Sequence, residues 1–125
     1  MSLREKMDQQ SGKRTYATVS HPVLGNVKIR SLTEREWQIG FATWFQDSDG
    51  KRIPERAIYG NVKLVQMCLV DPETDSLVYT DSFADLNSLV DQREEVTKPL
   101  FDAAWEFNRP ELAKNALSPS DTTTS

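Results

Sequence analysis

An apolar run that ends abruptly at Asp71-Pro72 sets the centre of the expected fold. Between Pro54 and Leu69, apolar residues cover more than one side of a helical wheel, which is typical of a helix packed on two or more sides. Proline is favourable at the first position of a helix, and Pro72 disfavours helical geometry in the residue before it. We therefore expect one central helix from Pro54 to Leu69, around which the other elements pack.

A β-hairpin is expected near the N-terminus. Residues 15–20 are β-branched and aromatic, and Val27-Lys28-Ile29-Arg30 alternates apolar with basic residues at a period of two. The segment between them contains proline and glycine, which favour turns. The alternation predicts that Val27 and Ile29 face inward and that Lys28 and Arg30 face water.

A capping box predicts where the next helix begins. The Thr33 side chain can accept from the Glu36 amide while the Glu36 carboxylate reaches back to Thr33. We expect this helix to end at Gln46, before a polar loop. Four aromatic residues fall on one stripe of it, namely Trp37, Phe41, Trp44 and Phe45. The stripe is either a core face, which amphipathic helices bury, or a partly exposed docking surface, since Trp and Phe are enriched at interfaces.

The C-terminal half is expected to hold a turn, a short strand and a further helix. Pro72–Asp75 suits a turn and Leu77–Tyr79 a strand. Thr80 or Asp81 is expected to cap the helix, whose apolar residues are Phe83, Leu86 and Leu89 or Val90.

The last main helix closes at Arg109-Pro110, and Pro99 marks either its start or a kink. One side of it carries Leu100, Phe101, Ala104, Trp105 and Asn108. Phe101 and Trp105 extend the candidate partner-binding surface of the aromatic stripe.

These elements predict an α+β protein in which an N-terminal β-hairpin packs on three to four helices. Residues 1–13 show no periodicity and are expected to form a flexible arm with one helical turn. Residues 14–117 form the single domain. Residues 118–125, SPSDTTTS, are too polar to bury anything and are expected to be a disordered tail.

Composition excludes several classes of protein. A net charge of −4 and a pI near 5.0 argue against a nucleic-acid-binding surface, which is basic. No apolar run approaches the roughly 20 residues that span a bilayer, and the polar N-terminus lacks the apolar segment of a secretory signal. The single cysteine, Cys68, excludes an internal disulfide, so we expect a reducing, cytosolic compartment.

Charge is distributed unevenly along the chain. Residues 1–35 hold seven Lys or Arg against three Asp or Glu, whereas residues 36–125 hold eight against sixteen. This asymmetry favours association of copies through the basic hairpin side, with Lys28 and Arg30 as candidate self-association residues, or association with a basic partner. The alternative interpretation is a solvated basic arm.

The candidates for catalysis and metal binding are few. His21 is the only histidine and lies in a proline-containing turn without a nucleophile motif, so we expect an exposed loop residue. Cys68 lies on the central helix, where a thiol is usually buried and inert. Asp47-Ser48-Asp49-Gly50 has its glycine fourth rather than sixth, and Ile58 stands twelfth where an EF-hand needs Glu, so a surface turn is expected.

The alternating acidic residues Asp71, Glu73 and Asp75 have no histidine near them in sequence to complete a metal or catalytic set. They suit a helix stop and a turn instead. Glycine-rich phosphate loops are absent from the sequence. The residues therefore predict a protein that is not an enzyme and that uses no cofactor or metal.

The order of elements in residues 27–109 resembles the tail assembly chaperones of long-tailed bacteriophages and prophages. VKIRSLTEREW resembles the strand and the R-x-L-(S/T)-x-x-E motif that open that domain. VKLVQMCLVDPETDSLVYTDSFADLNSL is similar to its central helix, Asp turn, L-(F/Y)-(T/S)-D patch and short helix. PLFDAAWEFNRP is similar to its terminal L-F-x-A-A-x-x-x-N helix, and MSLREK is a frequent opening there. The loop over residues 46–55 and Pro99 depart from the pattern.

The resemblance implies a non-enzymatic assembly factor in the host bacterial cytoplasm. Such proteins bind the tape measure protein, keep it soluble, help to recruit tail tube subunits and are absent from the mature virion. A frameshift near the end of the gene often yields an extended form that recruits tube protein, and Ala113-Lys114-Asn115 is a candidate slippery site here. The alternative is a structural virion protein, such as a head-tail connector or a minor tail component.

Overall fold

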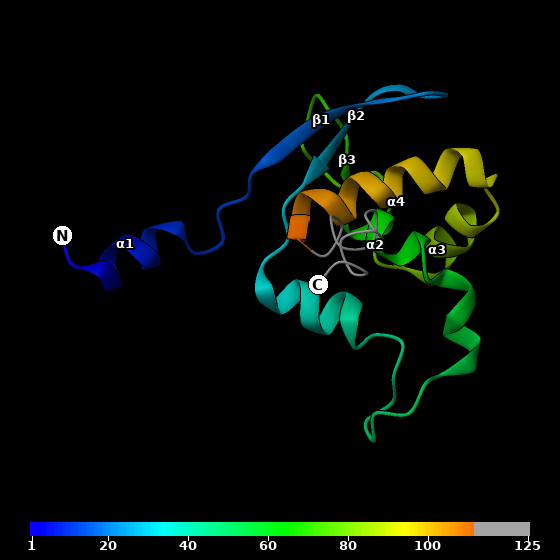
Figure 1. The fold of residues 1–125 in the computed structure, drawn as a ribbon, viewed down its shortest axis with the longest axis horizontal. Coiled ribbons are helices and arrows are strands. Elements are labelled where there is room, and N and C mark those ends of the chain that lie inside the picture. Colours follow the sequence, from blue (N-terminus) through cyan, green and yellow to red (C-terminus); the bar gives the residue numbers. More distant parts are fainter. Residues whose placement is uncertain (112–125) are drawn as a thin grey trace, which may run out of the picture.

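The computed structural model describes residues 1–111, which form a three-stranded antiparallel sheet packed on helices, so the α+β prediction is confirmed (Figure 1). The predictions for residues 112–125 lie outside the described residues. The elements in chain order are α1 (Leu3–Gln10), β1 (Tyr16–His21), β2 (Gly25–Arg30), the π-helix η1 (Glu36–Ala42), the 3₁₀ helix η2 (Pro54–Tyr59), α2 (Val62–Cys68), β3 (Leu69–Val70), α3 (Phe83–Val90) and α4 (Glu94–Asn108).

The predicted hairpin forms β1 and β2, which pair from Tyr16↔Arg30 to His21↔Gly25. Gly25 opens β2 with φ +80°, a conformation that residues with a side chain rarely adopt. Val27 and Ile29 are buried, as their alternation predicts. The sequence did not predict β3, which adds to the other edge of β2.

The single helix expected from Pro54 to Leu69 is wrong. The chain forms η2, passes through Gly60-Asn61 and then forms α2. It leaves the helix at Leu69, because Leu69-Val70 pairs with β2 instead, and Asp71-Pro72 ends a strand rather than a helix. The prediction that this segment packs on several sides holds for α2, in which six of seven residues are buried.

The capping box forms as predicted. Glu36 N donates to Thr33 Oγ1 at 3.1 Å, and Thr33 N donates to a Glu36 carboxylate oxygen at 2.9 Å. The helix ends at Ala42, not at Gln46 as expected. Its end is set by Thr43, whose backbone N and Oγ1 both donate to the Gln38 carbonyl, at 2.9 and 2.8 Å.

Two expectations for the C-terminal half need correction. The strand expected at Leu77–Tyr79 is a single bridge from Leu77 to Val70. Ser82 caps α3, by accepting from the Asp85 amide at 3.1 Å, and Thr80 binds the Asp85 carboxylate instead. Of the two alternatives for Pro99, the helix start is excluded, because α4 begins at Glu94 and contains Pro99.

The core lies between the sheet and the helices. Figure 1 shows the sheet on one side of α2 and α4, and η1 on the other. The largest fully buried side chains come from β2, α2, β3, α3 and α4, namely Ile29, Leu64, Val65, Cys68, Val70, Leu86, Leu89 and Leu100. The N-terminal arm holds an eight-residue helix, α1, rather than the single turn expected, because Ser2 and Glu5 form a capping box that begins it. This helix buries no residue and leads away from the body of the protein (Figure 1).

Leu64→Ala should destabilise the fold by about 2–5 kcal/mol, because it removes a fully buried side chain and leaves a cavity. Ile58→Ala is the control, since Ile58 is exposed on η2 and its truncation should cost less than about 0.5 kcal/mol. Urea unfolding followed by tryptophan fluorescence measures both values. Equal losses would contradict the placement of the core.

Candidate functional site

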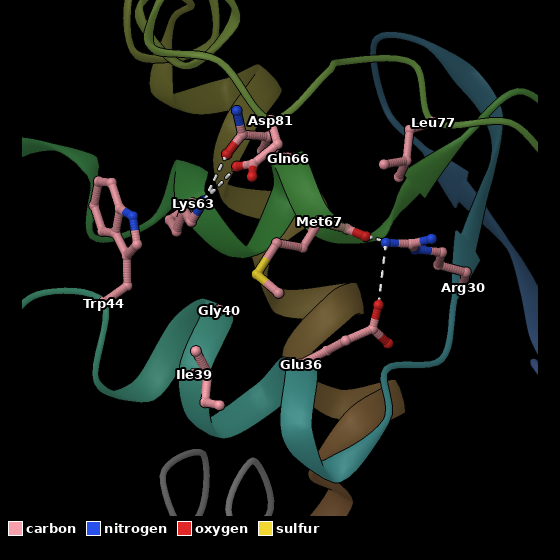
Figure 2. A pocket seen from close by; sticks show the side chains of 10 residues that line it. All are labelled: Arg30, Glu36, Ile39, Gly40, Trp44, Lys63, Gln66, Met67, Leu77 and Asp81. Carbon is pink, nitrogen blue, oxygen red and sulfur yellow. Dashed lines mark hydrogen bonds and ion pairs between the residues drawn. The ribbon is translucent and has the colours of Figure 1, made fainter. Parts of the chain in front are cut away.

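An open groove of about 370 Å³ lies between η1 and α2 (Figure 2). Its walls combine apolar side chains with two ion pairs, one toward each end. The lining residues are Arg30, Glu36, Ile39, Gly40, Trp44, Lys63, Gln66, Met67, Leu77 and Asp81. Figure 2 shows Arg30 and Glu36 at one end and Lys63, Gln66 and Asp81 at the other.

Close approach of η1 to α2 depends on Gly40. A Cβ at this position would lie 2.4 Å from Met67 Cε, so any larger residue must displace the end of that side chain. Met67 is half-buried, and its unbranched thioether adapts readily to neighbouring shapes. The floor of the groove is therefore tightly packed at Gly40 but deformable at Met67.

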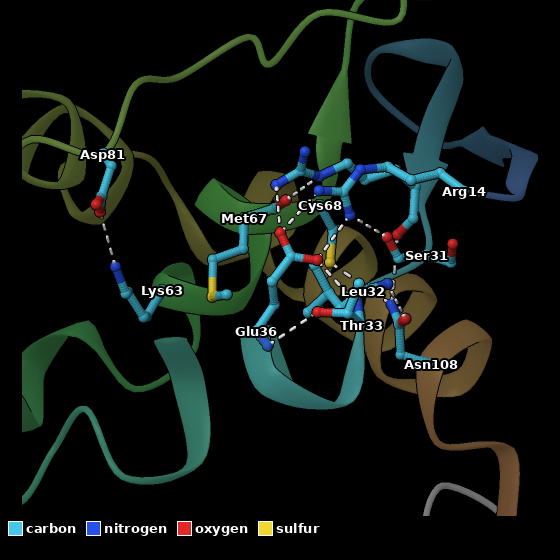
Figure 3. Close-up of polar contacts among 11 residues, drawn as sticks. Arg14, Ser31, Leu32, Thr33, Glu36, Lys63, Met67, Cys68, Asp81 and Asn108 are labelled. Atoms are coloured by element: carbon cyan, nitrogen blue, oxygen red, sulfur yellow. Dashed lines mark hydrogen bonds and ion pairs between the residues drawn. The ribbon is translucent and has the colours of Figure 1, made fainter. Parts of the chain in front are cut away.

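The first end of the groove is organised by the Glu36 carboxylate (Figure 3). Arg14 donates to both of its oxygens, at 2.7 and 2.8 Å, and Arg30 Nη2 lies 3.8 Å from it. The hydrogen bonds from Arg14, followed by the Thr33 amide, lower the pKa of Glu36 from 4.5 to about 2. Arg30 also donates through Nε to the Met67 carbonyl at 2.7 Å, which ties β2 to the end of α2.

The second end holds a buried lysine. Lys63 Nζ donates to Gln66 Oε1 at 3.1 Å and to Asp81 Oδ1 at 3.2 Å, and it lies 4.8 Å from the centroid of the Trp44 ring. The Lys63 side chain is 5% exposed, whereas that of Asp81 is 92% exposed. The cation is therefore fixed in the wall, and its carboxylate partner can leave at little cost in burial.

The aromatic stripe of η1 divides between core and surface. Trp37 and Phe41 are buried, and Trp37 packs against Trp105 of α4 with ring centroids 5.5 Å apart. Trp44, Phe45, Phe101 and Trp105 are half-buried and pack against the core. Of the six candidate partner-binding residues, Trp44 alone lines this groove.

The candidate self-association residues are paired within the chain. Lys28 Nζ lies 2.6 Å from an Asp75 oxygen and 4.8 Å from the centroid of the Tyr16 ring. Arg30 is engaged by Glu36 and Met67, so the expectation that it faces water is wrong. Its side chain is half-buried because β3 and η1 close over that end of β2.

The acidic turn has a structural role. Asp71 Oδ1 accepts from the amides of Glu73 and Thr74, at 2.8 and 3.3 Å, and Asp75 adopts φ +61°. Asp47 organises the other turn in the same way, through the amides of Asp49 and Lys51. Across residues 1–111, no three His, Cys, Asp or Glu side chains come close enough to hold a metal ion.

His21 and Cys68 are both buried. The expectation of an exposed His21 is wrong: its Nδ1 accepts from the amides of Val23 and Leu24, so Nε2 carries the hydrogen and donates to the Val96 carbonyl at 2.8 Å. This bond fastens the hairpin to α4. Burial raises the pKa of the Cys68 thiol to about 12, which leaves it inert at neutral pH.

Sequence reasoning missed Lys63, Gln66 and Met67 as wall residues. A signal was available, because Lys63 and Gln66 are the two polar residues in an otherwise apolar run, three positions apart on one face of a helix. Buried polar residues of this kind mark a place where the helix meets other polar groups.

Comparison of the chain with protein-family models, curated proteins and solved structures yields no match. No helix within residues 1–111 has the length and apolar character needed to cross a membrane. The function is therefore argued from the groove and from the sequence.

Glu36→Gln should change how stability depends on pH. The folded pKa of about 2 lies below the ordinary 4.5, so the carboxylate stabilises the fold fully above pH 4.5, and this contribution is lost as the pH falls from 4.5 toward 2. At neutral pH we expect a loss on the order of 1–2 kcal/mol, reduced from the full shift because the side chain is partly solvated. Melting temperatures recorded across this window should fall less steeply for the variant. Glu34→Gln is the control, because Glu34 is an exposed carboxylate paired with Arg109. If the melting temperature of Glu36→Gln falls as steeply between pH 4.5 and 2 as that of the unmodified chain, the lowered pKa of Glu36 is contradicted.

Proposed function

We propose that this chain is a tail assembly chaperone of a long-tailed bacteriophage or prophage. In this role it binds the tape measure protein, keeps it soluble and helps to recruit tail tube subunits in the host bacterial cytoplasm, without entering the mature virion. The observation that carries the proposal is the groove between η1 and α2, an open, partly apolar surface whose charged residues are held in ion pairs. The order of sequence motifs in residues 27–109 supports it independently.

The groove suits an amphipathic helix of the client. Helix-in-groove recognition needs an apolar floor that receives side chains at i, i+3, i+4 and i+7. Ile39 is 67% exposed on η1, whose buried residues are Trp37 and Phe41, and Met67 and Leu77 also line the groove. An adaptable methionine at the floor favours binding of several related client segments rather than one sequence.

The aromatic residues support this surface from behind. Trp44 lines the groove and stacks against Arg56, with 4.5 Å between the guanidinium carbon and the ring centroid. Trp37 and Phe41 hold η1 against α4. In this proposal Trp44 contacts the client directly, while Trp37 and Phe41 act by placing η1.

A frameshift-extended form of the chain would bring the tail tube protein to the same complex. Its candidate slippery site, Ala113-Lys114-Asn115, lies outside the described residues. The DNA over these codons tests it directly, since a sequence unable to re-pair after a one-base slip eliminates this site.

Ile39→Asp should abolish solubilisation of the tape measure protein while leaving the fold intact. The Ile39 side chain is exposed in the groove, so a charge there costs little stability in the free chain. The charge cannot, however, be buried under the apolar face of a client helix without a large desolvation cost. Ile58→Asp is the matched control, because Ile58 is 65% exposed and does not line the groove. To measure the effect, each variant is co-expressed with the tape measure protein, and the soluble fraction of the tape measure protein is determined. Equal behaviour of the two variants would contradict the assignment of the groove.

Mass spectrometry of purified virions separates the chaperone from a structural virion protein. The chaperone should be found in lysates during tail assembly and be absent from finished particles. Stoichiometric recovery of this chain with the tube and head proteins would replace the proposal with the structural alternative.

A further inference from the structure

Within residues 1–111, β1 is an edge strand, and no other strand pairs with its outer side. The sheet order is β1-β2-β3, which leaves one side of β1 without a neighbouring strand. Ser31 N donates to the Thr15 carbonyl at 2.8 Å, so residues 15, 17, 19 and 21 direct their backbone groups to β2. The amides and carbonyls of Tyr16, Thr18 and Ser20 therefore point outward, away from β2.

The edge lacks the features that usually protect exposed strands. Natural sheets block such edges with charged residues, proline or bulges. The sequence of β1, YATVSH, contains neither a formally charged side chain nor proline, and its pairing with β2 runs without a bulge through all six residues.

An apolar groove continues from this edge onto α4. It measures about 500 Å³ and is lined by Ala17, Val19, Ala103, Glu106, Phe107 and Pro110. Ala17, Val19 and His21 lie on the side of β1 that faces α4, and Ala17 and Val19 are only half-buried there. The open backbone edge and the apolar groove therefore form one continuous surface, which we call the β1–α4 surface.

We propose that the β1–α4 surface pairs with the same surface of a second copy, in an antiparallel arrangement about a twofold axis. The register that uses every outward backbone group sets Thr18 opposite Thr18 of the second copy, and Tyr16 opposite Ser20. Around such an axis both copies of α4 lie on the same face of the joined sheet. The two apolar grooves then meet, and each is covered by its counterpart.

Two observations favour a second copy over another occupant. Self-pairing of β1 places no like charges opposite one another, because the strand carries none. The outward positions Tyr16, Thr18 and Ser20 are spaced evenly about Thr18, so a twofold axis at Thr18 matches each outward donor with an acceptor, as an isologous interface requires. The contact is confined to one six-residue strand and a short stretch of α4, so we expect a weak, concentration-dependent dimer.

The mode of contact differs from association through basic side chains. Lys28 and Arg30 are already paired with Asp75 and Glu36 in the same chain. Backbone hydrogen bonds and apolar contacts are little affected by salt, so dimerisation should persist at about 1 M salt, where charge attraction is screened beyond about 3 Å. This inference does not depend on the chaperone function, and neither result decides the other.

Thr18→Pro tests the pairing. The change removes an N–H that points away from β2, so the ladder within the chain stays complete, as edge strands allow. Two intermolecular hydrogen bonds are lost at the twofold axis, and sedimentation equilibrium should show dimerisation weakened about 10- to 30-fold. Thr18→Val keeps the N–H and should dimerise as the unmodified chain does. Circular dichroism verifies the fold of both variants.

Thr18→Cys tests the register independently of any folding defect. Under mild oxidation the full chain should form a disulfide-linked dimer, whereas Ser48→Cys, in a distant exposed loop, should not. Cys68 is buried and contributes no background. A chain that stays monomeric at high concentration, a dimer that dissociates in high salt, or a dimer without cross-linking at position 18 would each overturn the proposal. If residues of the same chain or another protein cover the groove instead, the purified chain should stay monomeric at high concentration.

Discussion

The Glu36 carboxylate joins the start of η1 to both ends of the hairpin, and the position of η1 depends on these contacts. It accepts from the Thr33 amide that begins η1, from both terminal nitrogens of Arg14 before β1, and it lies beside Arg30 at the end of β2. One side chain thus fixes the angle at which η1 leaves the sheet. The groove exists because that angle holds η1 beside α2, with Gly40 against Met67.

Two further polar side chains, Asn108 and His21, join α4 to the hairpin and to the segment that follows it. Asn108 accepts from the Leu32 amide at 2.8 Å and donates to the Ala104 carbonyl at 3.1 Å, so the end of α4 is tied to the chain between β2 and η1. His21 ties the opposite end of β1 to Val96 near the start of α4. Because α4 is clamped to the hairpin at both ends, the sheet and α4 form a rigid base, while Asp81 and Ile39 remain exposed at the groove.

Local signals predicted the parts of this fold that depend on neighbours in sequence. The hairpin follows from a period of two around a turn, and the capping box of Thr33 and Glu36 needs only three residues of spacing. The sequence-based predictions were wrong where a residue distant in sequence determines the local structure. The local sequence predicts a helix through Leu69, but Leu69-Val70 forms a strand because it pairs with β2. The local sequence likewise predicts an exposed loop position for His21, which is buried because it binds Val96 of α4.

The candidate site shows the same division. The aromatic stripe was visible in the sequence, but its spacing does not reveal that α4 buries Trp37 and Phe41 while Trp44 reaches a groove. The sequence does not predict that Lys63 is buried, because burial of an ammonium group requires partners from elsewhere, here the Asp81 carboxylate and the Trp44 ring. Only the folded chain brings these three together.

The groove and the β1–α4 surface have no lining residue in common. A chain paired through β1 would therefore keep its groove open, and a dimer would present two of them. In the proposed chaperone role, the two grooves of one dimer would bind a long client more tightly than either groove alone, because the second contact forms at a raised effective concentration. Weak pairing through β1 would also allow the dimer to separate when the client is released. The proposed groove function and the proposed pairing are therefore compatible, since each uses a surface that the other leaves free.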